Sequence, residues 1–300
     1  MSRTIGFVGL GAMGLPMAEN LFARGFSVAG YDLRAAALDR LAERGGRRAQ
    51  SAADAARGAD VLVLMVVNAA QARTVLVEEG ALAALPEGGI VVLMATCAPA
   101  DAAALAASVE AAGRRFVDAP VSGGVVGAKG GTLTIMAAAA PAVFAAAKPV
   151  LDALGDKVFH VGERPGQGAM VKTVNQLLCG VHIAAAAEAF SLAAKAGLDG
   201  RVLLDILGGS AASSWMLKNR GPRMLEDEPE VTSAVDIFVK DLGIVLDAGR
   251  GSKAALPLAA AAHQMFLAAS GLGLGAADDS QVVRAYERLN PPKADEDGSR

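Results

Sequence analysis

The stretch that decides the fold is GFVGLGAMGLPMAENL, residues 6–21. Its glycines Gly9, Gly11 and Gly14 form the pattern G-x-G-x-x-G, directly after an apolar run and directly before an amphipathic helical pattern. In such a strand–turn–helix unit the first glycine allows a tight turn, the second lets a pyrophosphate approach the backbone, and the third lets the helix pack closely on the strand. The free N–H groups of the helix N-terminus then face the phosphates. A plain glycine turn gives the same triplet, so the interpretation depends on the residues that follow.

An acidic residue stands where a dinucleotide site needs one. Asp32 ends the next apolar run and lies 18 residues beyond Gly14, about the spacing at which a carboxylate accepts hydrogen bonds from the adenosine ribose. We therefore predict a cofactor site made of Gly9, Gly11, Ala12, Met13, Gly14 and Asp32. The carboxylate repels a 2′-phosphate, which favours NAD. Arg34, two residues on, leaves the use of NADP open.

Apolar runs and helical patterns alternate over the first half of the chain. The runs, which predict strands, are 4–9, 27–31, 61–66, 89–94, 115–119 and 132–137. Most are continuously hydrophobic, as expected for strands covered on both faces. Ala-rich helical patterns separate them, for example at 13–24, 35–44 and 99–112. We predict an α/β fold in which residues 1–165 form a Rossmann-type, doubly wound, mostly parallel sheet.

The pattern changes after residue 165. One helical stretch runs from Ala169 to Ala196 without a proline, and no strand pattern follows it. We predict an all-helical domain over residues 166–290, led by this long interdomain helix and concerned with substrate binding and oligomerisation. Such a helix is hard to cover within one small domain, so we expect a homo-oligomer, a dimer or tetramer. Residues 291–300 are polar and predicted to be a disordered tail.

The composition excludes several partners. The 300-residue chain has a formal net charge of −3 and no long basic run, so neither nucleic acid nor an anionic membrane is expected as a partner. We see no secretory signal and no uncharged apolar segment of the ~20 residues that a membrane span needs, and we predict a cytoplasmic protein. His, Cys, Asp and Glu residues show no metal-ligand spacing, so no metal is predicted.

Three later stretches offer a substrate site. In DAPVSGGVVGAKGG (118–131), Ser122 and the N–H groups of Gly123 and Gly124 could cradle a carboxylate, or the turn could be a plain glycine loop. In GQGAMVKTVNQLL (166–178), Lys172 and Asn175 share a helix face. A buried lysine with a lowered pKa is suited to proton transfer; the alternative is a surface lysine followed by a capping asparagine.

The third stretch is DIFVKDLGIVLDAG (236–249). Lys240 could neutralise a substrate carboxylate or touch the cofactor, or it could form a solvated charge pair with Asp241. On the long helix, His182 and Gln176 could meet a second substrate hydroxyl, although a hydrogen-bonded core histidine is the commoner role for His182.

In this order, these motifs resemble those of the β-hydroxyacid dehydrogenase family over about residues 4–290. The resemblance implies that Lys172 is the catalytic lysine and that Asn175 is its partner at the substrate hydroxyl, which Asn175 orients. It further implies that the carboxylate is held by Ser122, Gly123 and Gly124, and that Lys240 is the second lysine of the site. Thr96 matches the family's threonine near the nicotinamide. Many members have serine where this chain has Ala95, so any contact of that serine is missing.

Two further stretches, VVNAAQ (66–71) and NQLLCGVHIAAAAEA (175–189), resemble the L-threonate dehydrogenase branch of the family. The implied function is NAD-dependent oxidation of a small hydroxy acid, best L-threonate, at the carbon next to the carboxylate. 3-Hydroxyisobutyrate dehydrogenase and tartronate semialdehyde reductase remain alternatives. An imine reductase and a non-catalytic NAD-binding protein are more distant alternatives, and the presence of Lys172 argues against both.

Overall fold

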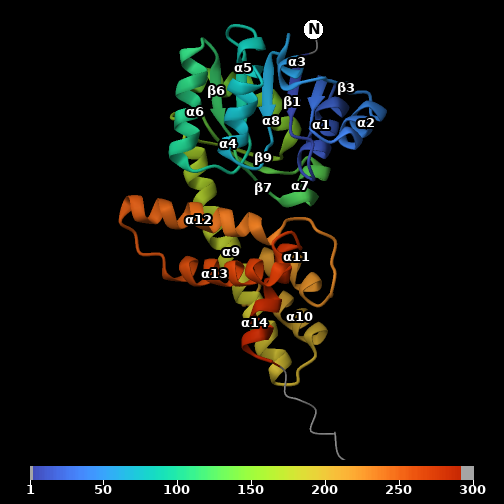
Figure 1. The fold of residues 1–300 in the computed structure, drawn as a ribbon, viewed down its shortest axis with the longest axis vertical. Coiled ribbons are helices and arrows are strands. Elements are labelled where there is room, and N and C mark those ends of the chain that lie inside the picture. The colour runs from blue at the N-terminus through green and yellow to red at the C-terminus, as the bar shows by residue number, and fades with distance from the viewer. Residues whose placement is uncertain (1–2, 292–300) are drawn as a thin grey trace, which may run out of the picture. The chain divides into compact units, whose positions relative to one another are not determined.

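The computed structural model describes residues 3–291, and the chain divides after Lys172 into an N-terminal unit and a C-terminal unit. Figure 1 colours the elements of both units in chain order. The division lies inside the long helix that the sequence predicts. Apart from Pro291, the tail predicted over 291–300 lies outside the described residues.

The N-terminal unit is built on a nine-stranded sheet with the order β3-β2-β1-β4-β5-β6-β8-β7, in which β9 also pairs with β8 (Figure 1). The strands are β1 (Thr4–Val8), β2 (Ser27–Tyr31), β3 (Arg47–Arg48), β4 (Val61–Leu64), β5 (Ile90–Leu93), β6 (Arg115–Asp118), β7 (Val121–Ser122), β8 (Thr134–Ala138) and β9 (Lys157–Gly162). The pairs from β3 to β6 are all parallel. The predicted fold class, a doubly wound and mostly parallel sheet, is confirmed.

Helices cover both faces of this sheet. They are α1 (Gly14–Ala23), α2 (Ala35–Glu43), α3 (Ala52–Ala56), α4 (Ala69–Arg73), the π-helical turn η1 (Thr74–Glu78), α5 (Ala81–Ala84), α6 (Pro99–Ala111), α7 (Gly124–Gly130) and α8 (Pro141–Leu154). Side chains alternate between the two faces along each strand. On β4, Val61 and Val63 join the core formed with α1, α2 and α8, whereas Leu62 and Leu64 join the core formed with α3 to α6.

The two edges of the sheet differ from the prediction. The sequence pattern predicts neither β3, β7 nor β9, and β8 runs antiparallel to β6 and β7. Ser122 on β7 faces Thr134 on β8. Because β6 and β7 are both antiparallel to β8, they run in the same direction, and the turn after β7 follows on the side of the sheet toward which β6 runs.

The C-terminal unit is helical throughout its described part. Its elements are the long helix α9 (Gln167–Lys195), which begins in the N-terminal unit, and α10 (Gly200–Gly209), α11 (Trp215–Met224), α12 (Val235–Ser252), α13 (Pro257–Ala269), the turns η2 (Ser270–Leu274) and η3 (Asp279–Val282), and α14 (Val283–Leu289). Gly180 explains how α9 and α12 come close, because a Cβ there would lie 2.8 Å from Cδ2 of Leu242. The second, all-helical part of the predicted fold is also confirmed.

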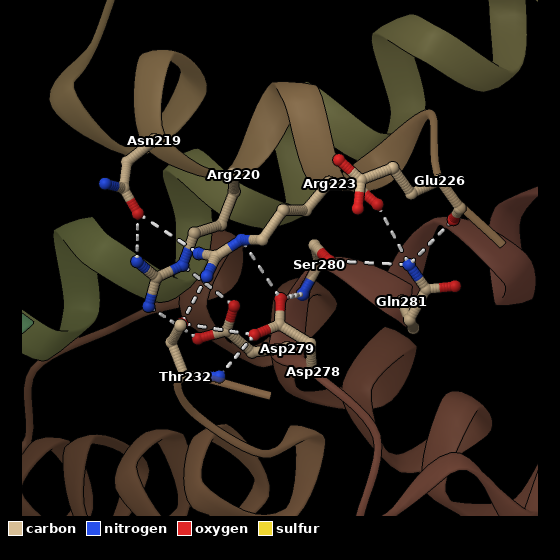
Figure 2. A network of polar contacts seen from close by, with 9 residues as sticks. All are labelled: Asn219, Arg220, Arg223, Glu226, Thr232, Asp278, Asp279, Ser280 and Gln281. Carbon is tan, nitrogen blue, oxygen red and sulfur yellow. Dashed lines mark hydrogen bonds and ion pairs between the residues drawn. The ribbon is translucent and has the colours of Figure 1, made fainter. Parts of the chain in front are cut away.

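A buried polar network joins α11 to η3 (Figure 2). The guanidinium of Arg220 donates two hydrogen bonds of 2.8 Å to the carboxylate of Asp279, and the two side chains are 8% and 0% exposed. Beside them, Asp278 accepts from the backbone N–H of Thr232 at 2.9 Å and pairs with Arg223 at 3.4 Å. Burial would raise the pKa of Asp278, but these hydrogen bonds and the Arg223 charge hold it below its usual range. The network therefore ties the 225–234 loop to the helical core.

Among residues 3–291, α9 alone meets the length and hydropathy criteria for a membrane-spanning helix. Core helices of soluble proteins meet the same criteria, and 44% of the most apolar window of α9 is buried inside the structure. Length and composition alone are weak evidence for a span.

Candidate active site

The glycine loop has the backbone geometry that a dinucleotide site requires. Gly9 has φ +95°, a left-handed conformation, and a Cβ there would lie 2.4 Å from the carbonyl oxygen of Met65. At Gly14 a Cβ would lie 1.8 Å from the carbonyl oxygen of Gly9. Gly11, in contrast, borders open space, since the nearest atom to its Cβ would be Nη2 of Arg34 at 3.9 Å. The loop is thus closed on the protein side and open where a pyrophosphate would approach the backbone.

Asp32 is joined directly to this loop. Its Oδ2 accepts from the N–H of Leu10 at 2.7 Å, and its Oδ1 accepts from the backbone N–H of Arg34 at 2.9 Å and from Nε of Arg34 at 3.1 Å. Burial opposes ionisation of this carboxyl, but the hydrogen bonds from Arg34 and Leu10 lower its pKa below the usual value. A fixed carboxylate therefore stands at the end of β2. Arg34 also reaches the carbonyl oxygen of Leu10, at 3.0 Å.

Thr96 lies just beyond β5, at the edge of the sheet where the parallel strands from β1 to β6 end. This is the edge at which ligands bind in doubly wound folds. Thr96 is half-buried, as is Met13, whereas Ala12 is exposed. The residues fit an NAD site in the N-terminal unit.

The Ser-Gly-Gly turn has a backbone that only glycine adopts readily. Ser122 ends β7, Gly123 has φ +129° and Gly124 has φ +59°. Side chains at the two glycine positions would be strained. All three residues are half-buried. A carboxylate cradle and a plain glycine loop both fit this backbone, and the cradle stays a prediction.

Asp118 anchors the start of the helix that carries Lys172, a role that the sequence analysis missed. Its Oδ2 accepts from the N–H groups of Gly166 at 2.8 Å and Ala169 at 2.9 Å. Burial raises the pKa of this carboxyl to about 6, although the backbone hydrogen bonds oppose the rise. The available signal was an acidic residue at the end of a strand, four positions before Ser122. Asp118 thus connects the predicted carboxylate cradle to the first turn of α9.

Lys172 and Asn175 follow on α9. Lys172 is only 7% exposed, so the interpretation as a surface lysine is wrong. Asn175 is half-buried and lies three residues further along the same helix, about 4.5 Å along its axis. Asn175 is not a capping residue, because it lies well inside α9.

In the C-terminal unit, Asn175 belongs to a chain of polar contacts that ends at Lys240. Nδ2 of Asn175 donates to Oε1 of Gln176 at 2.9 Å, and Nε2 of Gln176 donates to Oδ2 of Asp241 at 2.5 Å. Oδ1 of Asp241 lies 2.7 Å from Nζ of Lys240. Asp241 is 2% exposed, so its pair with Lys240 is not a solvated surface pair.

Gln176 and His182, the two residues predicted as partners of a second substrate hydroxyl, have different surroundings in the structure. Gln176 is buried and committed to Asp241 and Asn175. The side chain of His182 is exposed, so the interpretation as a core histidine is wrong. No group of three His, Cys, Asp or Glu side chains in residues 3–291 is arranged to hold a metal.

Two family profiles together match nearly the whole chain. Residues 4–162 match the NAD-binding domain of 6-phosphogluconate dehydrogenase. Residues 166–286 match the domain described as the NAD-binding domain of NADP-dependent 3-hydroxyisobutyrate dehydrogenase.

Individual relatives are similar over almost their full length. The chain is 46% identical to L-threonate dehydrogenase of Cupriavidus necator, over 97% of this chain and 99% of the relative. It is 42% identical to L-threonate dehydrogenase of Escherichia coli K12, over 97% of both. A crystal structure described as 3-hydroxyisobutyrate dehydrogenase from Salmonella typhimurium superposes with a TM-score of 0.91 at 43% identity, covering 94% of this chain and 99% of that one.

Proposed function

Because the chain belongs to the family of NAD-dependent hydroxy acid dehydrogenases, we propose that it oxidises L-threonate at the hydroxyl next to the carboxylate. NAD⁺, when bound, supplies the two-electron oxidant. The observation that carries the reaction type is Lys172, a buried lysine on a helix whose first turn is fixed by Asp118. The likeness to L-threonate dehydrogenases at 40–46% identity supports the substrate.

Each side chain has a distinct role in the proposed reaction. Ser122, Gly123 and Gly124 hold the substrate carboxylate, and the ammonium of Lys240 balances its charge. Nζ of Lys172 accepts the proton of the reacting hydroxyl as the C–O bond becomes a carbonyl group. Positioning by these groups supplies much of the rate, because a bound and aligned substrate reacts without further loss of entropy.

The cofactor side of the site is proposed for Gly9, Gly11, Ala12, Met13, Gly14, Asp32 and Thr96, with Lys240 at its border. In this proposal residues 1–165 bind the cofactor, and residues 166–290 contribute to the substrate site. The enzyme is proposed to act in the cytoplasm.

A panel of hydroxy acids with NAD⁺ tests the function. Formation of NADH is followed by absorbance with L-threonate, 3-hydroxyisobutyrate and glycerate. We expect L-threonate to give the highest kcat/KM. A higher value with 3-hydroxyisobutyrate would support the second candidate, which the name of the superposed Salmonella structure favours. No oxidation of any hydroxy acid would overturn the proposal.

A homo-oligomer is also part of the proposal. Helix α10 has no buried residue, and its Val202 and Ile206 are 57% and 60% exposed. Leu192 near the end of α9 is 67% exposed. Exposed apolar residues on neighbouring turns are typical of a surface that a partner covers. We expect light scattering to give a dimer or tetramer for the wild type and a smaller species for Ile206→Asp. A wild-type monomer at micromolar concentration would contradict this.

A further inference from the structure

Gln176 and Asp241 have no role in the reaction as proposed above, yet both are buried and both lie in the polar chain that starts at Asn175. Gln176 is 7% exposed and Asp241 is 2% exposed. Burying polar groups is unfavourable unless they find polar partners. Gln176 is hydrogen-bonded to Asn175 and to Asp241, and Asp241 also pairs with Lys240. Both come from the C-terminal unit, from α9 and α12.

We propose that Gln176 and Asp241 are positioning residues that fix the direction of the Asn175 side-chain amide, so that Asn175 offers its oxygen Oδ1 to a second hydroxyl of the substrate. The inference rests on the proposed function, since it assigns Lys172 to the reacting hydroxyl.

The direction follows from the chemistry of the three groups. A carboxylate only accepts hydrogen bonds, whereas a primary amide donates at one end and accepts at the other. Gln176 must therefore turn Nε2 toward Asp241, as the 2.5 Å contact has it. Its Oε1 then faces Asn175, which must turn Nδ2 toward Gln176, as in the 2.9 Å contact. The reverse orientation of either amide would set oxygen against oxygen or nitrogen against nitrogen.

The second N–H of Asn175 is also engaged. Nδ2 lies 3.3 Å from Sγ of Cys179, one turn further along α9. Both hydrogens of this amide thus have acceptors within the C-terminal unit. The remaining polar atom of the half-buried Asn175 side chain is Oδ1, which accepts hydrogen bonds and donates none. In this proposal Oδ1 is the atom that meets the substrate.

An acceptor at this position selects the substrate. The reacting hydroxyl has a single hydrogen, and in the proposed reaction that hydrogen is transferred to Nζ of Lys172. Oδ1 of Asn175 therefore needs its hydrogen from a different hydroxyl. L-Threonate carries one on the neighbouring carbon, whereas 3-hydroxyisobutyrate carries a methyl group as its further substituent. An acceptor of the site left without a donor disfavours the deoxy substrate.

The test compares L-threonate with its 3-deoxy analogue, 2,4-dihydroxybutanoate of the same configuration at the reacting carbon. The ratio of the two kcat/KM values reports the second hydroxyl alone. We expect Gln176→Leu to reduce this ratio roughly tenfold, about the effect of one hydrogen bond, because it frees the Asn175 amide to turn. This variant leaves the pair between Lys240 and Asp241 in place.

A charge-exchanged pair separates orientation from mere packing. Asp241→Asn alone should reduce the ratio, since an amide at position 241 can present either end to Gln176. The double variant Gln176→Glu/Asp241→Asn places an acceptor-only carboxylate next to Asn175 again and a donor at position 241. We expect the double variant to restore the ratio to within about threefold of the wild type. Asp247→Asn is the matched control, because Asp247 is an exposed carboxylate on the same helix, paired with Arg250.

A second readout does not depend on turnover. With ¹⁵N-labelled asparagine and glutamine, the side-chain resonances of Asn175 and Gln176 should shift in Asp241→Asn and return toward the wild-type positions in the double variant. Unchanged resonances in Asp241→Asn would overturn the proposal, even in a chain that oxidises no hydroxy acid. If Gln176→Leu oxidises L-threonate and keeps the wild-type ratio of the two kcat/KM values, the positioning role is overturned and the proposed function stands.

Discussion

At the scale of single residues, the candidate site depends on a few side chains whose surroundings decide their chemistry. In the proposed function, the buried Lys172 accepts a proton, and Asp32, whose carboxylate is fixed by Leu10 and Arg34, binds a ribose. The same residue types on an exposed surface would have no comparable function. Two substitutions test these assignments separately.

Replacement of Lys172 should abolish the proton acceptor and spare the cofactor site. For Lys172→Ala we expect kcat to fall by roughly 10²–10⁴-fold, the usual loss when general acid–base catalysis is removed. NADH binding, measured by fluorescence, should stay within about threefold of the wild type, because the glycine loop and Asp32 are unchanged. Near-normal kcat in this variant would contradict the assigned role.

Replacement of Asp32 should change the choice of cofactor. Asp32→Ala removes the carboxylate that repels a 2′-phosphate, and it also releases Arg34, whose Nε donates to Oδ1 of Asp32. We expect the ratio of kcat/KM with NADP⁺ to that with NAD⁺ to rise at least about tenfold. Asp32→Ala/Arg34→Ala is the control, in which the gain should be smaller because the phosphate partner is gone. A wild-type enzyme that prefers NADP⁺ would refute the assignment.

At the scale of elements, the sequence predicts what the burial pattern makes visible. Strands such as β4 and β5 are buried on both faces. Their residues are therefore continuously apolar, and the sequence alone predicts them as strands. β3 consists of two exposed arginines, and β7 of only two residues. Neither is long enough to form a pattern. The motifs around Ser122 and Lys172, like the glycine loop, can be recognised in the sequence because each requires particular residue types in close succession; their roles stay a prediction.

Contacts between distant segments were not predictable. Asp118 meets the start of α9 across a sequence separation of 48 residues to Gly166, and Gln176 meets Asp241 across 65 residues. Such pairings depend on how helices and strands pack, and a local sequence pattern does not predict this packing. The sequence therefore revealed most of the groups proposed to touch ligands and missed the groups that hold them in place.

The anchoring of α9 by Asp118 should depend on pH. Because the pKa of Asp118 is raised from 3.8 to about 6 in the folded chain, the folded state binds more protons than the unfolded state between these values. The contribution of Asp118 to the free energy of unfolding therefore falls as pH rises from about 4 to about 6, by about 3 kcal/mol.

Asp118→Asn has no carboxyl group to titrate at this position, so it serves as the reference for the wild type. Urea unfolding at pH 4.5 and pH 7.5 should give a wild-type stability that declines relative to Asp118→Asn at the higher pH. Both proteins should retain activity, which shows that each has a native fold. Equal pH dependence in the two proteins would contradict the raised pKa.

At the scale of the whole molecule, each unit has its own means of stability. The N-terminal unit has apolar cores on both faces of its sheet. The C-terminal unit combines an apolar core, in which Phe238 and Phe266 stack at 5.1 Å between ring centres, with the buried network of Figure 2. A buried ion pair is costly to break, because removal of one partner leaves the other charge without compensation.

Breaking the pair between Arg220 and Asp279 should destabilise the C-terminal unit. We expect Asp279→Ala to lower the free energy of unfolding by about 3–5 kcal/mol in urea titrations, since Arg220 stays buried without its partner. The double variant Arg220→Met/Asp279→Leu should recover most of this loss, because it leaves no buried charge. As a control, Asp152→Ala removes the partner of the exposed Lys148 and should change stability by less than about 1 kcal/mol. A loss in the control as large as in Asp279→Ala would argue against burial as the cause.

The division of the chain inside α9 has a consequence for making hybrids of related dehydrogenases. Lys172 is the last residue of the N-terminal unit and Asn175 is the third residue of the C-terminal one, yet both belong to the same helix. A crossover at the boundary of the units would join a lysine from one parent to an asparagine from another. It would also separate the first turn of α9, which Asp118 anchors, from Gln176. Shuffling within this family should therefore succeed with crossovers before Gly166, where the whole of α9 is inherited from one parent together with α12.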